Sequence, residues 1–238
     1  MVEIQRQVAH SEVNADFKAK YASIITYMQD CSFVHLLGQD GMMHELDKRG
    51  MGMFLTCRQC NLYKIPVFEQ DIVVRTWVYS LNRFIGYRNT VVYDKASMEV
   101  LAASYAGGAF VDLASGLPAH IPDEAIKDVL IEKKFDGMEY LPRKVAIPDL
   151  DGDVKDPFTI YRSHIDSYGH TNNAQYIRMV TDCLDEEVYP KIMRAEYKIP
   201  AKSGDKIYPT VYKKQADKTT VVLRNGKGDV CLSCELTM

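Results

Sequence analysis

The sequence lacks several features that would define its class at once. Its 238 residues contain no uninterrupted apolar run near the roughly 18 residues of a membrane span. The opening Met-Val-Glu-Ile-Gln-Arg-Gln has no apolar core of a secretory signal. Six cysteines are too few for a disulfide scaffold in a chain of this length, and without a signal they are expected to be reduced. We therefore expect a cytoplasmic protein that does not enter a membrane.

The chain also has little net charge. Its 29 Lys and Arg residues and 32 Asp and Glu residues leave −3 at pH 7, so no long-range attraction to nucleic acid or to an anionic membrane is expected. Hydrophobic residues make up 47% of the chain, which is enough to bury a substantial core. The composition indicates a globular protein whose basic docking surfaces, if it has them, are local.

Helical periodicity comes first along the chain. Residues 16–37 predict a helix in which Ile24, Met28, Cys31 and Val34 share one face. Further apolar residues lie on its other sides, so we expect this helix to be largely enclosed.

Period-two patterns of β-branched and aromatic residues follow the helix and predict an antiparallel meander. A helix followed by such a meander forms a unit in which the sheet can wrap the helix. The predicted strands include 73–79, 87–93 and 100–105, and the turn signals that separate these runs are Asn82-Arg83, Asp94-Lys95 and Gly107-Gly108.

The chain contains this unit twice. Tyr-Lys-Ile-Pro at 63–66 recurs at 197–200, and residues 22–25 of the first helix match 174–177 of a second apolar helical pattern. A helix and a meander in the same order in both halves predict an α+β fold, the tandem or double hotdog. In this fold each of two helices is wrapped by an antiparallel sheet, and the two sheets join edge to edge.

The repeat also predicts the domain boundaries. We expect an N-terminal hotdog at 1–116, a linker at 117–156 and a C-terminal hotdog at 157–238. The linker is rich in proline and acidic residues and contains a short charged helical pattern around residues 123–134.

The densest group of reactive side chains lies just before the second helix. Asp166, Tyr168, His170, Asn172 and Asn173 fall within eight residues. Asn172 is suited to cap the helix, which would place this group at a helix N-terminus. Unpaired N–H groups and the positive end of the helix dipole stabilise negative charge there, as acyl chemistry requires.

These residues resemble a known family, the acyl-acyl-carrier-protein (acyl-ACP) thioesterases of plants and bacteria. Residues 166–173, Asp-Ser-Tyr-Gly-His-Thr-Asn-Asn, are similar to its Asp-x-Asn-x-His-Val-Asn-Asn motif. Residues 194–197, Arg-Ala-Glu-Tyr, are similar to its Arg-x-Glu element, and 52–58 and 71–77 resemble its Gly-x-x-Trp-x-x-x-Arg and Gly-Asp-x-Val segments. Tyr168 replaces the family's asparagine. Tyr197 replaces the cysteine of plant members, which argues against a thiolate nucleophile.

The resemblance implies a thioesterase that hydrolyses fatty acyl-ACP to free fatty acid and carrier protein in fatty acid biosynthesis. On the family's pattern Glu196 is the general base, His170 is its partner or a donor to the thioester, and Asp166 is the orienting group. Asp166 is the alternative base, since burial of a carboxylate in an apolar cleft raises its pKa. The hydroxyl of Tyr168 can replace only the hydrogen-bond donor function of the asparagine amide that the family has at this position.

The same pattern assigns the developing oxyanion to Asn172 and to backbone N–H groups near Asn173. Each residue also has a plainer interpretation. Asp166 and Asn172 suit a turn and a helix cap, His170 suits a solvated loop, and Glu196 suits an exposed strand position.

Two other functions remain open. The first is hydrolysis of acyl-coenzyme A, which shares the pantetheine arm of the carrier, and the second is a hotdog that binds acyl groups without reaction. We expect no cofactor and no metal, because the Cys57-x-x-Cys60 spacing on a strand directs the two thiols to opposite faces. Exposed sheet edges make a homodimer reasonable.

Overall fold

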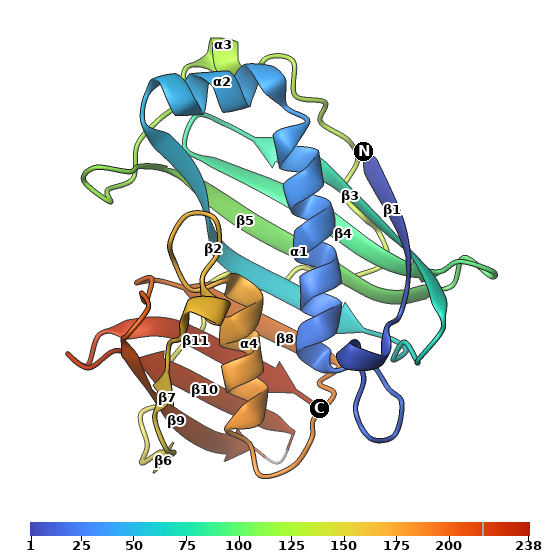
Figure 1. Cartoon of the computed structure of the whole chain (residues 1–238), viewed down its shortest axis with the longest axis vertical. Coiled ribbons are helices and arrows are strands. Elements are labelled where there is room, and N and C mark those ends of the chain that lie inside the picture. Colours follow the sequence, from blue (N-terminus) through green and yellow to red (C-terminus); the bar gives the residue numbers. More distant parts are fainter. Residues whose placement is uncertain (216) are drawn as a thin grey trace.

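A single antiparallel sheet carries both halves of the chain (Figure 1). The computed structural model describes residues 1–215 and 217–238. Within them the strand order is β1-β3-β4-β5-β2-β8-β11-β10-β9-β6, and β7 pairs with β9. The second half reverses the order of the first, so β2 and β8 meet at the centre. The strands are β1 (Val2–Gln7), β2 (Met51–Leu62), β3 (Asp71–Leu81), β4 (Ile85–Asp94), β5 (Val100–Asp112), β6 (Asp153–Val154), β7 (Phe158–Thr159), β8 (Ile192–Tyr197), β9 (Lys206–Gln215), β10 (Lys218–Arg224) and β11 (Val230–Thr237).

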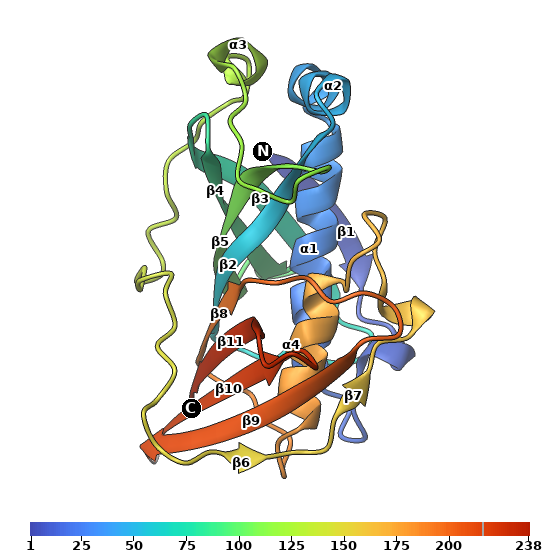
Figure 2. The same cartoon turned by 90° about the vertical axis from the view of Figure 1, so that its left-hand side faces the viewer.

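Two helices, α1 and α4, lie side by side on one face of the sheet, one across each half (Figures 1 and 2). Short 3-10 turns precede both of them. A helix packed against each half of a continuous antiparallel sheet is the α+β double hotdog, so the fold prediction is confirmed. The helical elements are η1 (His10–Glu12), α1 (Tyr21–Leu37), α2 (Asp40–Lys48), α3 (Asp123–Ile126), η2 (Arg162–His164) and α4 (Asn173–Asp182).

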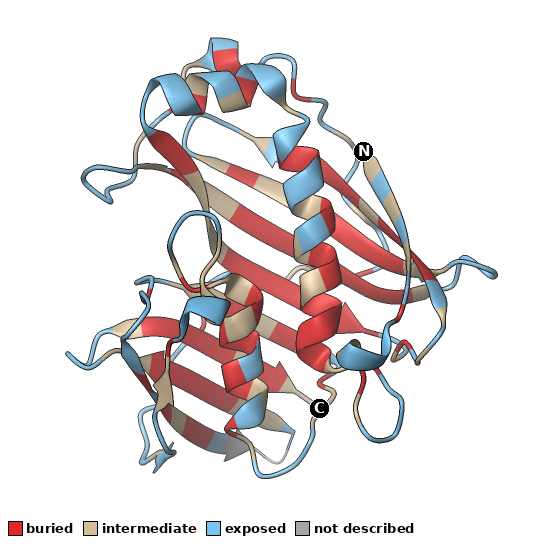
Figure 3. Cartoon of the chain, viewed as in Figure 1, coloured by how far each residue is buried: buried red, intermediate tan, exposed pale blue. Residues whose placement is uncertain are grey.

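The apolar face of α1 supplies the centre of the core (Figure 3). Ile24, Met28 and Cys31 are fully buried as predicted, but Val34 is 49% exposed because His35 and Leu36 take the buried side of the last turn. The helix begins at Tyr21, and the prediction that it begins at residue 16 is wrong. Phe17 has a φ of 62°, a left-handed conformation that a right-handed helix cannot contain.

The predicted meander is confirmed with one correction. The three predicted runs fall in β3, β4 and β5, and the side chains of Asn82 and Asp94 accept backbone N–H groups in the turns between them. Gly107 and Gly108 form no turn but lie inside β5. A Cβ at Gly107 would come within 2.8 Å of the Tyr87 ring. The glycine therefore allows a neighbouring side chain to approach the strand and does not reverse the chain.

The connection between the halves runs along the face of the sheet that α1 and α4 leave open (Figure 2). Trp77 of β3 donates through Nε1 to the carbonyl of Lys133 at 2.8 Å. The predicted charged helix is limited to the four residues of α3, because Ile131 leaves the helical path and forms a parallel bridge with Val78 of β3. The connection ends where β6 joins β9 of the second half.

Candidate active site

The loop that precedes α4 holds its polar side chains in a fixed turn. The backbone N–H of Asp166 donates to the carbonyl of His170 at 2.8 Å. Asp166 Oδ1 in turn accepts the N–H groups of Tyr168 at 2.9 Å and His170 at 3.2 Å. The loop anchors this carboxylate through one of its two oxygens.

Asn172 caps α4, as predicted. Its Oδ1 accepts the backbone N–H of Ala174 at 2.9 Å. The preceding Thr171 donates through both its backbone N and its Oγ1 to the carbonyl of Ala201, each at 2.9 Å. The Asn172 carbonyl accepts the N–H groups of Gln175 at 2.9 Å and Tyr176 at 3.4 Å, so among the described residues the first-turn N–H that is left without a partner is that of Asn173. Asn172 and Asn173 therefore stand where negative charge is favoured.

The loop and the start of α4 open onto a cavity of about 960 Å³ between the two halves. Its walls in the first half come from α1, β2, β4 and β5. Ligand pockets in proteins typically measure about 300–1,000 Å³, so the volume suits a substrate of that class. The predicted site residues that line it are Asp166, Tyr168, His170, Asn172 and Asn173.

The rings of His170 and Tyr168 both lie against Phe54 of β2. Each ring centroid is 5.5 Å from that of Phe54. His170 Nδ1 is buried and has no hydrogen-bond partner in the part of the chain that the structure describes. Burial, and then the charge of Asp166, raise the pKa of Tyr168, so its hydroxyl is protonated at neutral pH and can donate. A loop of one half and a strand of the other thus build the site together.

Glu196 does not join this group. On β8 the side chains of Ala195 and Tyr197 face the helices, so alternation turns Glu196 to the opposite face. Its Oε2 accepts the backbone N–H of Val145 in the linker at 3.2 Å. The predicted pairing of Glu196 with His170 is therefore corrected, because the sheet lies between the two side chains.

Tyr197 and Tyr176 are site residues to which the sequence assigned no chemistry. Tyr197 donates through its hydroxyl to the carbonyl of Asn173 at 3.4 Å, and the hydroxyl of Tyr176 accepts the N–H of Ala201 at 2.7 Å. Burial raises the pKa of Tyr176 to about 12, so this hydroxyl also stays protonated. Both tyrosines line the cavity. In the sequence, both tyrosines fall at the regularly spaced apolar positions of β8 and α4. They share these positions with core residues, so the pattern marks them as buried and not as site residues.

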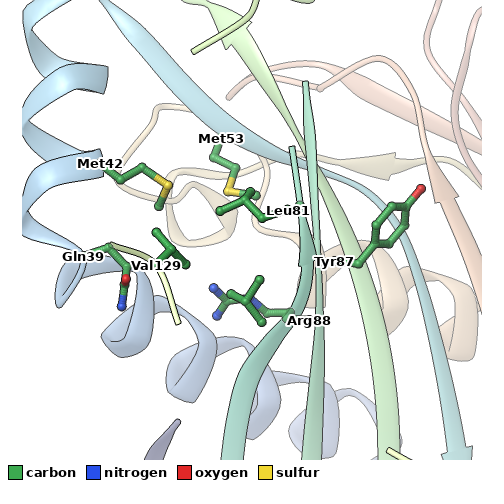
Figure 4. Close-up of a pocket in the computed structure, with 9 residues that line it drawn as sticks. Gln39, Met42, Met53, Leu81, Tyr87, Arg88 and Val129 are labelled. Carbon is green, nitrogen blue, oxygen red and sulfur yellow. The ribbon is translucent and has the colours of Figure 1, made fainter. Parts of the chain in front are cut away.

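A second, small cavity is lined in part by α2 and lies beside the main one (Figure 4). It measures about 10 Å³, the space of roughly one water molecule. Met42 and Val129 line it, and Met53 and Arg88 belong to the walls of both cavities. The two cavities are therefore neighbours that share Met53, Gly86 and Arg88 in their walls.

Two further findings on the described residues concern a metal site and a membrane-spanning helix. Among residues 1–215 and 217–238, no three His, Cys, Asp or Glu side chains gather in a way that could hold a metal ion. Cys57 packs in a cluster with linker residues and Cys60 packs in the main core, so the two thiols point to opposite faces as predicted. None of the helices in the described chain combines the length and the apolar character needed to cross a bilayer.

Two family models match most of the sequence. The acyl-ACP thioesterase N-terminal domain matches residues 3–129, and the acyl-ACP thioesterase C-terminal domain matches residues 149–236. No curated protein matches the chain.

Solved structures with the same fold include two acyl-ACP thioesterases. The 12:0-ACP thioesterase from Umbellularia californica superposes with a TM-score of 0.85 at 17% identity, over 99% of this chain and 96% of that one. An acyl-ACP thioesterase from Bacteroides thetaiotaomicron gives a TM-score of 0.84 at 18% identity, over the same shares of the two chains.

Proposed function

The chain belongs to the acyl-ACP thioesterase family, and we propose that Asp166 is the general base in its hydrolysis of fatty acyl-ACP. The placement of the two candidate carboxylates carries this proposal. Asp166 lines the cavity together with His170, whereas Glu196 is bonded to the linker on the other face. A general base has to lie within hydrogen-bond reach of the water that it deprotonates. Of the two carboxylates, Asp166 is the one on the cavity side.

In the proposed reaction Asp166 takes a proton from water, and the resulting hydroxide attacks the carbonyl carbon of the thioester. The backbone N–H of Asn173 and the side-chain NH₂ of Asn172 stabilise the oxygen that becomes negative. The His170 ring and the Tyr168 hydroxyl supply further polar contacts at the reacting group. When the C–S bond breaks, the proton held by Asp166 passes to the departing thiolate, which leaves free fatty acid and carrier thiol.

The carrier end of the substrate fits the mouth of the cavity. Lys202 lines the cavity and is exposed, whereas the ammonium of Lys198 lies 3.7 Å from Glu196 Oε2, on the linker side of the sheet. The positive charge of Lys202 complements an acidic carrier protein and the phosphate of its pantetheine arm. Lys202→Glu should raise KM for acyl-ACP while kcat changes little. Lys133→Glu on the linker, across the sheet, is the matched control and should leave KM unchanged.

We further infer a place in fatty acid biosynthesis, because the reaction ends the attachment of the growing chain to its carrier. All six cysteines fall in the described part of the chain and carry free thiols, which supports a reducing compartment such as the cytoplasm. The sheet ends at β1 and at β6, and pairing of such edges would allow two copies to associate.

Hydrolysis of matched acyl-ACP and acyl-coenzyme A panels, from short to long chains, tests the proposed function. We expect turnover of acyl-ACP with a lower KM than acyl-coenzyme A. Asp166→Asn should lower kcat by at least about 100-fold, the scale of lost general-base catalysis. Glu196→Gln, the matched carboxylate control, should keep most of the rate. Tight binding of acyl-ACP by the wild type without turnover would instead establish a non-catalytic acyl-binding protein.

A further inference from the structure

Arg58 places a buried cation in the wall of the cavity. It lies on β2, on the same face of the strand as the core residue Cys60, and its side chain lines the cavity together with Asp166. The residue is only 3% exposed. Its Nε and Nη1 are buried without a hydrogen-bond partner among the described residues. A buried guanidinium without an acceptor is strongly unfavourable, so its acceptor has to come from the contents of the cavity.

A second arginine, Arg88 of β4, adds to the positive charge but is partnered. Its Nη1 donates to the carbonyl of Ser32 at 2.6 Å. Burial, and then the nearby charge of Arg58, lower the pKa of Arg88 to about 10. None of the ion pairs formed within residues 1–215 and 217–238 includes either arginine. The wall of the cavity also contains the carboxylates of Asp30, Asp112 and Asp166, but none of them forms an ion pair with these two arginines.

Arg58 lies close to the start of α4. Its backbone is paired with Ala195 of β8, and Tyr197 follows Ala195 on the same face. The Tyr197 hydroxyl reaches the carbonyl of Asn173 in the first turn of α4 at 3.4 Å. A helix start and a guanidinium with unused donors thus face one region, and each favours an anionic oxygen.

We propose that Arg58 and the first turn of α4 bind the carboxylate of the free fatty acid that hydrolysis releases. The proposal rests on the proposed function, because the acyl carbonyl has to react beside the loop that precedes α4. The thioester oxygen is neutral before the reaction, whereas the product carries a full negative charge. The ligand class is a long-chain carboxylate, and the free acid should compete with the substrate for the cavity.

Equilibrium binding of a saturated fatty acid and of the primary alcohol with the same chain length tests this site. The two ligands share their apolar contacts and differ in charge. We expect the wild type to bind the acid at least about tenfold more tightly, the scale of a hydrogen bond to a charged group. Arg58→Met should abolish this preference, and Arg58→Lys should retain part of it. Arg83→Met removes an exposed arginine and should behave as the wild type.

A measurement on the wild type keeps the test decisive if Arg58→Met does not fold. A titration of carboxyl-labelled acid by ¹³C NMR should give the bound acid a lower pKa than the free acid, because the guanidinium favours the anion. Equal affinity for acid and alcohol in the wild type, an acid preference that survives in folded Arg58→Met, or a raised pKa of the bound acid would overturn the proposal.

The binding assay involves no turnover. Hydrolysis without acid preference would therefore refute only the carboxylate site, and acid preference without hydrolysis would refute only the proposed function.

Discussion

The loops that precede α1 and α4 share a backbone but not a chemistry. Each follows a 3-10 turn, η1 or η2, and each is closed by one antiparallel bridge. Val13 pairs with Ala19 in the first loop, and Ile165 pairs with Thr171 in the second. The repeated unit therefore extends through the loops, beyond the helices and strands in which the sequence shows it.

Equivalent positions of the two loops hold different side chains. Asn14 stands where the second loop has Asp166, and Lys18 stands where it has His170. In each loop the N–H of the first residue donates to the carbonyl of the second at 2.8 Å. The Asn14 amide is bonded to Glu187, whereas Asp166 lines the cavity. The fold supplies the turn twice, and the second turn places a carboxylate and an imidazole in the wall of the described cavity.

Exchanging the reactive pair for its counterpart in the first loop should have the largest effect. The double variant Asp166→Asn, His170→Lys gives the second loop the side chains of the first. We expect kcat to fall at least about 1,000-fold, because the proposed general base and its neighbour are both lost. Single-turnover hydrolysis of acyl-ACP measures this fall. Thermal unfolding near that of the wild type is the control, and a rate within tenfold of the wild type would contradict the assignment.

Exchanging only the histidine should have a smaller effect. In His170→Lys an ammonium group, which can only donate, replaces a ring that can both donate and accept. We expect kcat to fall about 100-fold while KM changes little, since the apolar cavity is intact. Steady-state kinetics separate the two constants. A change confined to KM would show that His170 binds the substrate and takes no part in the reaction.

The shared turn itself can be tested at Gly169. Its φ is 76°, and a Cβ there would meet no atom within 4 Å, so backbone strain is the only cost of a side chain. Gly169→Ala should lower the free energy of unfolding by about 1–2 kcal/mol in urea denaturation. Gly41→Ala in α2 is the matched control and should raise it by about 0.5 kcal/mol, because there the added Cβ is unstrained. Equal effects of the two changes would contradict the left-handed turn.

The reverse exchange should have the smallest effect. Asn14→Asp with Lys18→His places the reactive pair on the first loop, which does not contribute to the walls of the described cavity. In the inactive Asp166→Asn, His170→Lys background we therefore expect no gain in acyl-ACP hydrolysis. Hydrolysis assays at high enzyme concentration measure this. A recovered rate would mean that the turn and its two side chains suffice without the cavity.

The repeat and the reactive loop could be predicted from the sequence because both are local patterns. Asn172 is a strong helix cap by residue type alone, and it precedes a clear helical periodicity. The spacing from Asp166 to His170 lets a short turn present both side chains together. These features depend on neighbours within a few residues, and the structure keeps them.

The face of the sheet on which Glu196 lies is set by the alternation of side chains along β8. Apolar Met193, Ala195 and Tyr197 alternate with Arg194 and Glu196, which already separates both charges from the core side. The family's role for this glutamate conflicts with that alternation. That the opposite face is covered by the linker could not be predicted, because the contact joins segments far apart in the sequence.

Arg58 and Gly107 also depend on neighbours that are distant in the sequence. Arg58 lies on the same face of β2 as the core residues Cys60 and Leu62. A charged residue at a position where the alternation predicts an apolar one can be recognised in the sequence alone. Its surroundings come from β8 and α4 and cannot be read locally. The glycine turn signal was misleading because the space that Gly107 leaves is used by Tyr87 of the adjacent strand.

The direct pairing of β2 with β8 has a consequence for how such a protein is assembled. A fragment with one half alone would leave one of these strands as a bare edge, open to any matching segment that it meets. Covalent joining gives each half its proper neighbour at any dilution, without a search by diffusion. It also lets the two halves diverge in sequence, as the loops before α1 and α4 have done.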